Sequence, residues 1–134
     1  MALTSLDTNI LVYAFQAGAK HKRSLAILDA RPVASVQILN EYAHLSRRKL
    51  RRSWREIEQD LDIVRTMAAT VEPITEAANR EALRIVGRYQ LSFYDSVLLA
   101  VALESGVETL YSEDMQDGLV IDERLTIVDP YGCS

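Results

Sequence analysis

The chain has 134 residues, a formal net charge of -4, 49% hydrophobic residues and 25% charged residues. This balance is typical of a globular domain and excludes a disordered chain or a generally basic polyanion binder. No apolar stretch approaches the roughly 20 residues that span a bilayer. The only cysteine, Cys133, cannot form an internal disulfide, so we expect one domain over residues 1–134 in the reducing cytoplasm, with no membrane partner.

The predicted elements alternate along the chain between short strands and longer helices. Strands are expected at residues 3–6, 32–35, 71–72, 109–111 and 125–128. Helices are expected at residues 10–15, 21–30, 37–50, 54–68, 76–89 and 94–104. Strands separated by helices predict an α/β fold with three α/β/α layers around a central, mostly parallel sheet.

Two of the predicted helices indicate where the core lies. Residues 97–103 are wholly apolar, which predicts a central, buried helix. In the helix at 54–68, Trp54, Ile57, Leu61 and Val64 recur at three- and four-residue spacing. We therefore expect Trp54 to pack in the core with this apolar stripe.

Four carboxylates occupy positions that are costly unless a partner compensates the charge. Asp7 and Asp114 follow predicted strands, where ligands bind in parallel α/β folds, while Glu41 and Asp95 border apolar helix faces. Clustered carboxylates without a metal repel each other, so at least one should have a raised pKa. Together these four residues indicate a metal-dependent nuclease.

Each carboxylate also has a simpler local interpretation. Asp7 fits a helix N-cap, and Asp95 fits the third position of a capping box that begins at Ser92. Glu41 can pair with a nearby cation on its own helix, and Asp114 can be an ordinary turn residue. Asp117, before Gly118, is also typical of a turn but is a candidate fifth carboxylate.

The available ligands favour Mg²⁺, with Mn²⁺ as a substitute, because carboxylate oxygens are hard ligands and zinc prefers His and Cys. The chain has only two histidines, and we interpret His21 and His44 as surface residues. Phosphoacceptor receiver domains and aspartate-nucleophile phosphatases need a lysine late in the chain. No lysine follows Lys49, so both alternatives are disfavoured.

A basic segment is the candidate RNA-binding surface. It carries six cations within nine residues, directly after the predicted helix that holds Glu41: Arg47, Arg48, Lys49, Arg51, Arg52 and Arg55. Its simpler interpretation is a solvated helix junction. Its functional interpretation is a set of phosphate contacts that guide RNA to the carboxylates.

The segments around the carboxylates resemble those of PIN-domain ribonucleases, and specifically the VapC-type toxins of type II toxin-antitoxin systems. The most specific are Ser-Phe-Tyr-Asp-Ser-Val-Leu-Leu-Ala, which contains Asp95, and Leu-Tyr-Ser-Glu-Asp, which ends at Asp114. The resemblance implies a Mg²⁺-dependent endoribonuclease. It assigns Asp7, Glu41, Asp95 and Asp114 as the metal-binding and catalytic quartet, with Thr8, Asn9 and Ser112 as supporting polar residues. Glu113 and Asp117 remain alternatives or additions to the fourth ligand.

The resemblance also implies partners, namely an RNA substrate, a cognate antitoxin and a second copy of the chain in a homodimer. Tyr13, Phe15 and Leu25 are candidates for the groove that an antitoxin segment occupies, or they belong to the core. Two alternatives stay open: a PIN-fold nuclease that processes RNA without an antitoxin, and a catalytically silent PIN module that binds RNA or protein.

Overall fold

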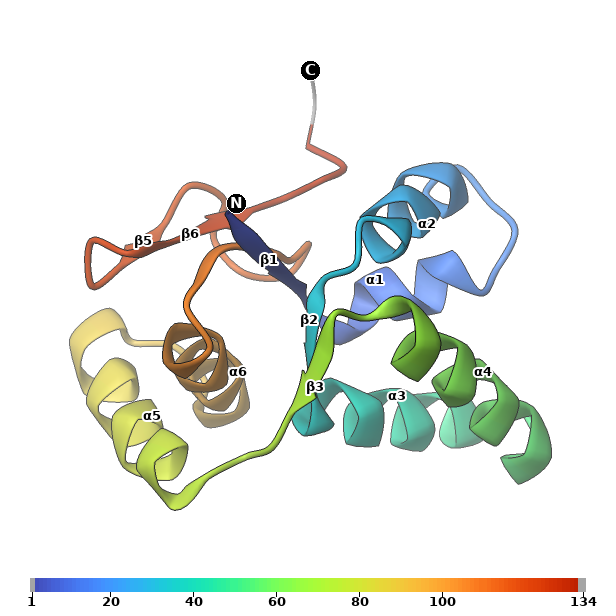
Figure 1. The fold of residues 1–134 in the computed structure, drawn as a ribbon, viewed down its shortest axis with the longest axis horizontal. Helices are drawn as coiled ribbons and strands as arrows, with labels where there is room; N and C mark the ends of the chain where they lie inside the picture. Colours follow the sequence, from blue (N-terminus) through green and yellow to red (C-terminus); the bar gives the residue numbers. More distant parts are fainter. Residues whose placement is uncertain (1, 133–134) are drawn as a thin grey trace.

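The central sheet of the computed structural model, which describes residues 2–132, has six strands in the order β3-β2-β1-β4-β6-β5 (Figure 1). The strands are β1 (Leu3–Leu6), β2 (Val33–Ser35), β3 (Thr70–Glu72), β4 (Val107–Tyr111), β5 (Val120–Ile121) and β6 (Leu125–Val128). Every neighbouring pair is parallel except β5 and β6, which are antiparallel. The mostly parallel sheet predicted from the sequence is confirmed. Cys133, on which the expectation of a reducing compartment depends, lies outside the described residues.

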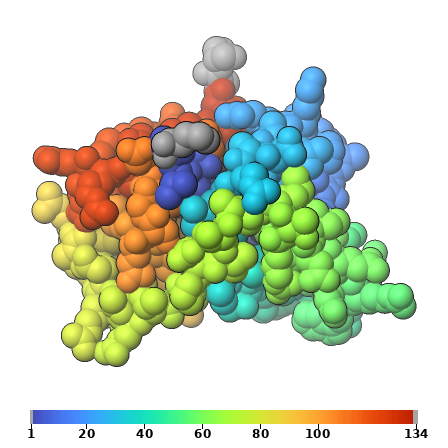
Figure 2. Space-filling view, viewed as in Figure 1, coloured from blue at the N-terminus to red at the C-terminus, as the bar shows by residue number. Residues whose placement is uncertain are grey.

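In the described part of the chain, six helices cover the two faces of this sheet. They are α1 (Thr8–Ala14), α2 (His21–Asp29), α3 (Val36–Arg48), α4 (Trp54–Met67), α5 (Glu76–Tyr89) and α6 (Phe93–Glu104). Helices α1 to α4 pack together on one side, and α5 packs on α6 on the other side (Figure 1). In the space-filling view, α4 (green) and α5 (yellow) form opposite flanks of the molecule (Figure 2). No helix in the described part of the chain is long and apolar enough to cross a membrane.

Side-chain caps explain where several helices begin. Ser35, Ser53, Thr75 and Ser92 each accept a hydrogen bond from a backbone N–H in the first turn of the following helix. Ser53 and Glu56 form a complete capping box. Because these caps satisfy backbone donors at the helix starts, they set the entry points of α3, α4, α5 and α6.

The core confirms one prediction and contradicts another. Residues 96–103 of α6 are all buried, as expected for a central helix. In contrast, Trp54 is 60% exposed, so the prediction that it packs in the core is wrong. The buried stripe of α4 starts at Ile57, one turn later, and the Trp54 ring instead lies 5.3 Å from the Arg47 guanidinium.

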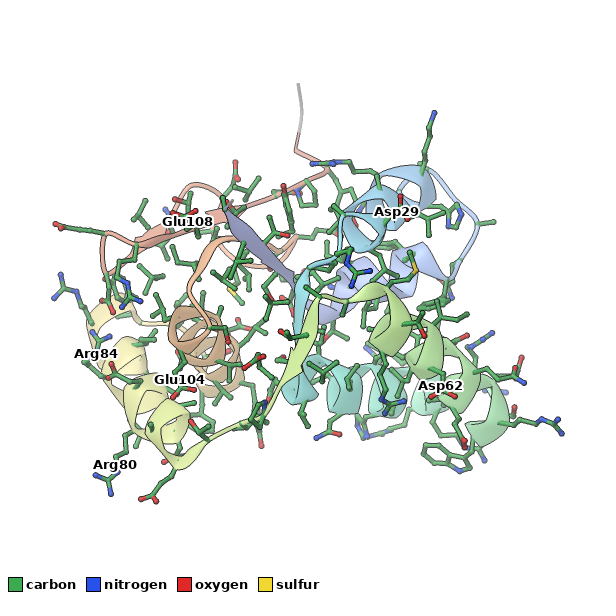
Figure 3. The ribbon with its side chains drawn as sticks, in the orientation of Figure 1. Asp29, Asp62, Arg80, Arg84, Glu104 and Glu108 are labelled. Carbon is green, nitrogen blue, oxygen red and sulfur yellow. The ribbon has the colours of Figure 1, made fainter. Side chains whose placement is uncertain are left out.

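The β5–β6 hairpin is absent from the sequence-based prediction because β5 is only two residues long. The turn that joins the strands places Asp122 and Glu123 at positive φ, a conformation that usually selects Gly or Asn. Arg84 of α5 donates to the Asp122 carboxylate at 2.5 Å, and the Tyr89 hydroxyl accepts the Asp122 N–H. These contacts attach the hairpin to α5, where Arg84 is labelled at the edge of the molecule (Figure 3).

The strand order changes direction between β1 and β4. From β1 the chain continues to β2 and β3 on one side, whereas β4 is followed by β6 and β5 on the other side. The Asp7 N–H donates to the Tyr111 carbonyl at 2.9 Å, so the carboxyl ends of β1 and β4 are held together. Ligands of open α/β sheets bind in the crevice outside such a switch point.

Candidate active site

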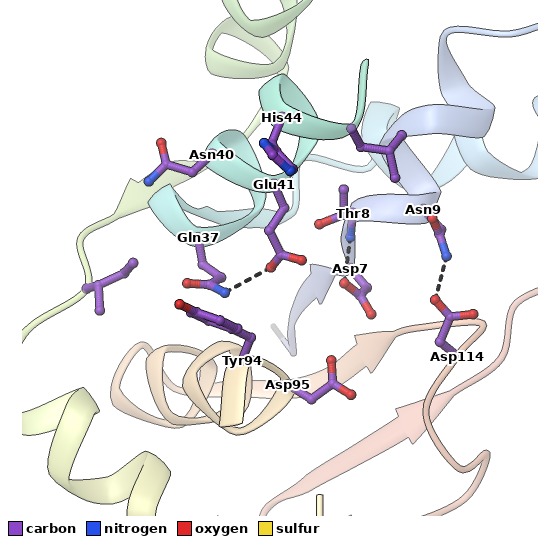
Figure 4. Close-up of a pocket in the computed structure, with 12 residues that line it drawn as sticks. Asp7, Thr8, Asn9, Gln37, Asn40, Glu41, His44, Tyr94, Asp95 and Asp114 are labelled. Carbon is purple, nitrogen blue, oxygen red and sulfur yellow. Dashed lines mark hydrogen bonds between the residues drawn. The ribbon is translucent and has the colours of Figure 1, made fainter. Parts of the chain in front are cut away.

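A cavity of about 610 Å³ lies at this switch point and brings the four predicted carboxylates together. They come from four different segments: Asp7 after β1, Glu41 on α3, Asp95 on α6 and Asp114 after β4. Figure 4 shows Glu41, Asp7, Asp95 and Asp114 around one opening. The predicted proximity of these side chains is therefore present in the fold, although they are far apart in the sequence.

Within residues 2–132, Asp7 accepts more hydrogen bonds on its carboxylate than any of the other three. It is the N-cap of α1, and its carboxylate accepts hydrogen bonds from the Thr8 N–H at 2.7 Å and from the Ser112 hydroxyl at 2.9 Å. Asp7 is buried, with only 8% of its surface exposed. The N-cap interpretation is thus correct, and the same residue also lines the cavity.

Burial controls the protonation of this site. Burial, together with the smaller effect of the negative charges of Asp95 and Glu41, raises the pKa of Asp7 from 3.8 to about 6, although the hydrogen bonds from Thr8 and Ser112 act in the opposite direction. The pKa of Glu41 is also raised, first by burial and then by Asp95, although its bond to Gln37 acts in the opposite direction. The predicted raised pKa is confirmed, but burial contributes more to it than repulsion.

The two helix-borne carboxylates have different local support. The Gln37 side-chain amide donates to Glu41 Oε1 at 2.9 Å, one helical turn earlier on α3, and this bond replaces the pairing of Glu41 with a cation that the sequence left open. The Asp95 N–H donates to the Ser92 hydroxyl, as the capping pattern predicts. Within residues 2–132 the Asp95 carboxylate itself has no hydrogen-bond partner and lines the cavity (Figure 4).

Asp114 is the only one of three acidic residues in its loop that reaches the cavity. The Asn9 side-chain amide donates to its carboxylate at 2.5 Å. Glu113 instead accepts from the Lys20 ammonium at 2.5 Å, and Asp117 accepts the Asp129 N–H at 2.8 Å. Neither Glu113 nor Asp117 lines the cavity, so this geometry favours Asp114 as the fourth carboxylate.

The residues of the cavity fit a hard divalent cation. Their donor atoms are carboxylate oxygens, which Mg²⁺ and Mn²⁺ prefer. Thr8 lines the same cavity, and its hydroxyl oxygen is buried without a hydrogen-bond partner among the described residues, as expected where an ion or its water supplies the partner. No three His, Cys, Asp or Glu side chains of residues 2–132 already form a compact coordination cluster. Mg²⁺ is commonly held by one or two carboxylates together with waters, which does not need such a cluster.

Comparison with known families identifies the domain that carries this site. The family model of the PIN domain matches residues 5–116, a span that begins just before Asp7 and ends just after Asp114. The chain belongs to the PIN-domain family. No relative of curated function matches the sequence.

The fold of this PIN domain is similar to that of solved structures from toxin-antitoxin systems. It is 24% identical to the Mycobacterium tuberculosis toxin VapC20, described as cleaving the sarcin-ricin loop, over 83% of this chain and 89% of that chain with a TM-score of 0.65. It is 21% identical to a chain of a toxin-antitoxin complex from Klebsiella pneumoniae, over 99% and 100% of the two chains with a TM-score of 0.71. It is 17% identical to a chain of DNA-bound VapBC from Salmonella typhimurium, over 97% of this chain and 99% of that chain, with a TM-score of 0.66. These likenesses confirm the predicted three-layer fold.

The basic segment of the PIN domain divides into two groups. Arg52 is half-buried and donates three hydrogen bonds to the Asp60 carboxylate, at 2.8, 2.9 and 3.0 Å, so its guanidinium is already bound within the chain. The other five cations are exposed. Among the described residues none of these five forms an ion pair within 4 Å.

Sequence reasoning missed several neutral or weakly basic residues of the cavity. Gln37, Asn40 and His44 line it beside Glu41, and Tyr94 lines it beside Asp95. The spacing of 37, 40, 41 and 44 places these four polar residues on one face of α3, which is a recognisable signal. His44 is exposed, as predicted, but it also lines this cavity.

Proposed function

We propose that this PIN domain is a metal-dependent endoribonuclease that acts as the toxin of a toxin-antitoxin pair. The observation that supports this most is the meeting of four carboxylates from separate segments in one cavity at the switch point. Membership of the PIN family and the fold shared with VapC toxins support nuclease activity on RNA. The alternative without an antitoxin, in RNA processing, uses the same site and the same chemistry.

The residues of the cavity have two proposed roles: some bind the ion, and others position those ligands. Asp7, Glu41, Asp95 and Asp114 are the proposed ligands of Mg²⁺ or Mn²⁺. When bound, the ion lowers the pKa of a water and neutralises charge on the phosphoryl oxygens. Thr8 and Ser112 fix the position of Asp7, and Asn9 and Gln37 orient Asp114 and Glu41.

The proposed RNA contacts come from the five exposed cations of the basic segment, namely Arg47, Arg48, Lys49, Arg51 and Arg55. Phosphate contacts of this kind supply affinity without base specificity. Arg52 is left out of this set because its guanidinium is bound to Asp60. Selection among RNAs therefore depends on the shape of the RNA loop and not on these phosphate contacts.

The proposed partners are a cognate antitoxin and a second copy of the chain. Of the three apolar residues considered for the antitoxin groove, Tyr13 packs edge-on against Tyr131 and Phe15 packs on Tyr42. Only Leu25 is exposed, in a shallow hollow beside Met67. Leu25 is therefore the best placed of the three to contact an antitoxin, and the other two belong to the packing of the chain itself.

RNA cleavage tests the proposed function directly. Purified protein is incubated with a mixture of structured RNAs, with Mg²⁺ or with chelator, beside Asp95→Asn and the matched control Asp62→Asn on the exposed face of α4 (Figure 3). We expect cleavage that requires Mg²⁺, falls about 100-fold or more in Asp95→Asn, and is unchanged in Asp62→Asn. Equal cleavage by Asp95→Asn and the wild type contradicts the assigned site. Absence of both cleavage and metal binding favours a silent PIN module instead.

A further inference from the structure

The residue next to Asp114 is bound outside the carboxylate cavity. Glu113 accepts a hydrogen bond from the Lys20 ammonium at 2.5 Å, and Glu113 does not line the cavity. Asp114, one residue later, lines the cavity and accepts a hydrogen bond from the Asn9 side chain (Figure 4). Two adjacent residues of this loop are therefore held by two different donors, one in the cavity and one outside it.

The Lys20 ammonium is held by aromatic rings as well as by Glu113. It lies 4.8 Å from the centroid of the Tyr13 ring and 5.2 Å from the centroid of the Tyr131 ring. These two rings pack edge-on, with their centroids 5.4 Å apart. Because aromatic rings attract cations, neighbours from three different segments restrict the position of this one ammonium group.

The turn after β6 completes this cluster, which consists of Tyr13, Lys20, Ser24, Glu113 and Tyr131. In Figure 1 the chain after β6 runs toward α2, and the Tyr131 hydroxyl forms a hydrogen bond with the Ser24 hydroxyl of α2. The Ser24 hydroxyl itself donates to the Lys20 carbonyl at 2.7 Å, so Tyr131 is the donor in the first bond. Both the backbone and the ammonium group of Lys20 are therefore fixed by contacts from distant parts of the chain.

Asp114 needs support of this kind because its own hydrogen bond is exposed. The bonds that hold the Asp7 carboxylate are buried, whereas the bond from Asn9 to Asp114 faces water. An exposed bond exchanges readily for bonds to water, so it restrains a side chain less than a buried bond does. Glu113 and Asp114 share a peptide bond, so a fixed Glu113 side chain limits the movement of the backbone that carries Asp114.

We propose that Lys20 is a positioning residue for the metal ligand Asp114, on which it acts through Glu113. This inference rests on the proposed function and adds a residue outside the cavity to those that place the ion. Removing a residue that orients a metal ligand typically weakens metal binding. Charge alone predicts the opposite effect of removing Lys20, because the loss of a positive charge makes the nearby carboxylates more attractive to another cation. The sign of the change therefore separates positioning from general electrostatics.

Mn²⁺ binding by the metal-free, full-length protein tests this assignment, with dissociation constants obtained from the EPR signal of free Mn²⁺ at pH 7.5. We expect Lys20→Met, which keeps an unbranched side chain of similar length, to weaken Mn²⁺ binding about 10-fold. Lys20→Arg should bind Mn²⁺ within about twofold of the wild type, because Arg also pairs with carboxylates and aromatic rings. The matched control is Lys22→Met at an exposed position of α2, which should not weaken binding.

A second background shows whether Lys20 acts through Asp114. In Asp114→Asn, which lacks the carboxylate that Lys20 positions, Lys20→Met should change the Mn²⁺ dissociation constant less than about twofold, because the two effects are coupled. A general structural role of Lys20 would weaken binding equally in both backgrounds. Urea unfolding in chelator shows which variants are folded. Where Lys20→Met does not fold, Glu113→Gln takes its place in both backgrounds, with the same pattern expected.

Three results overturn the proposal. They are Mn²⁺ binding by Lys20→Met that is as tight as that of the wild type or tighter, equal weakening in both backgrounds, and equal weakening by Lys22→Met. In each case Mn²⁺ binding and metal-dependent RNA cleavage by the wild type would still support the nuclease. If the wild type does not bind Mn²⁺, the metal-dependent function fails and the positioning role of Lys20 fails with it.

Discussion

At Asp7, burial and neighbouring charge act in the same direction on one protonation equilibrium. The pKa of this carboxyl is about 6 in the folded protein, against 3.8 for the unperturbed group. Between these two pH values, the folded state holds a proton that the unfolded state has released. The free energy of unfolding of the metal-free protein should therefore fall as pH rises from about 4 to about 6, by at most roughly 3 kcal/mol from this residue.

Asp7→Asn removes this titration while it keeps the size of the side chain and an oxygen to accept the Thr8 N–H. In the presence of chelator at pH 7.5, we expect the variant to be more stable than the wild type by roughly 1–3 kcal/mol, with a flatter dependence on pH. Urea unfolding between pH 4 and 8 measures both effects, and the exposed Asp62→Asn is the control. A variant that is less stable than the wild type at pH 7.5 would show that the bonds from Thr8 and Ser112 outweigh the cost of burying the charge.

At the scale of elements, the α3–α4 hairpin depends on one buried ionic network. Asp60 of α4 is 6% exposed and accepts hydrogen bonds from the Tyr42 hydroxyl of α3, at 2.7 Å, and from Arg52 of the connecting loop. A buried carboxylate that loses its cation is left uncompensated, which is strongly destabilising. The network therefore holds α4 against the helix that carries Glu41.

Arg52→Met tests this structural role against the exposed Arg55→Met. Because Arg52 is 29% exposed, water offsets part of the loss, and we expect a destabilisation of about 2 kcal/mol. Arg55→Met should stay within about 0.5 kcal/mol of the wild type. Urea unfolding at neutral pH measures both variants. Equal stability of the two proteins would mean that Asp60 is adequately held by Tyr42 alone.

Much of this arrangement was predictable because its signals are local. The bounds of α5 (Glu76–Tyr89) and β6 (Leu125–Val128) agree with the sequence-based ranges, since caps, turns and apolar periodicity lie within each segment. The quartet was predictable because its members follow strands or border apolar helix faces. The rest depends on contacts between distant segments: no periodicity indicates that Arg52 reaches Asp60, or that Tyr94 lies on the same cavity as His44.

At the scale of the whole molecule, the charge distribution opposes the proposed substrate until a cation is bound. The net charge is -4, and the carboxylates that face the cavity are negative where a phosphate must approach. Repulsion and burial raise the free energy of the metal-free folded state, and a bound ion relieves both. Under the proposed function, stability, ion binding and RNA binding are therefore linked through the same four side chains.

Mg²⁺ or Mn²⁺ should accordingly raise the melting temperature of the wild type. An ion at 100 times its dissociation constant stabilises the folded state by about 2.7 kcal/mol, which for a chain of this size corresponds to a shift of about 10 °C. Because a protonated Asp7 does not bind a cation, the shift should be larger at pH 7.5 than at pH 5.5, on the two sides of its pKa of about 6. Asp95→Asn should lose most of the shift, and sodium chloride at matched ionic strength should produce little. An equal shift in Asp95→Asn and the wild type would mean that the ions act on the surface charge of the whole molecule and not in the cavity.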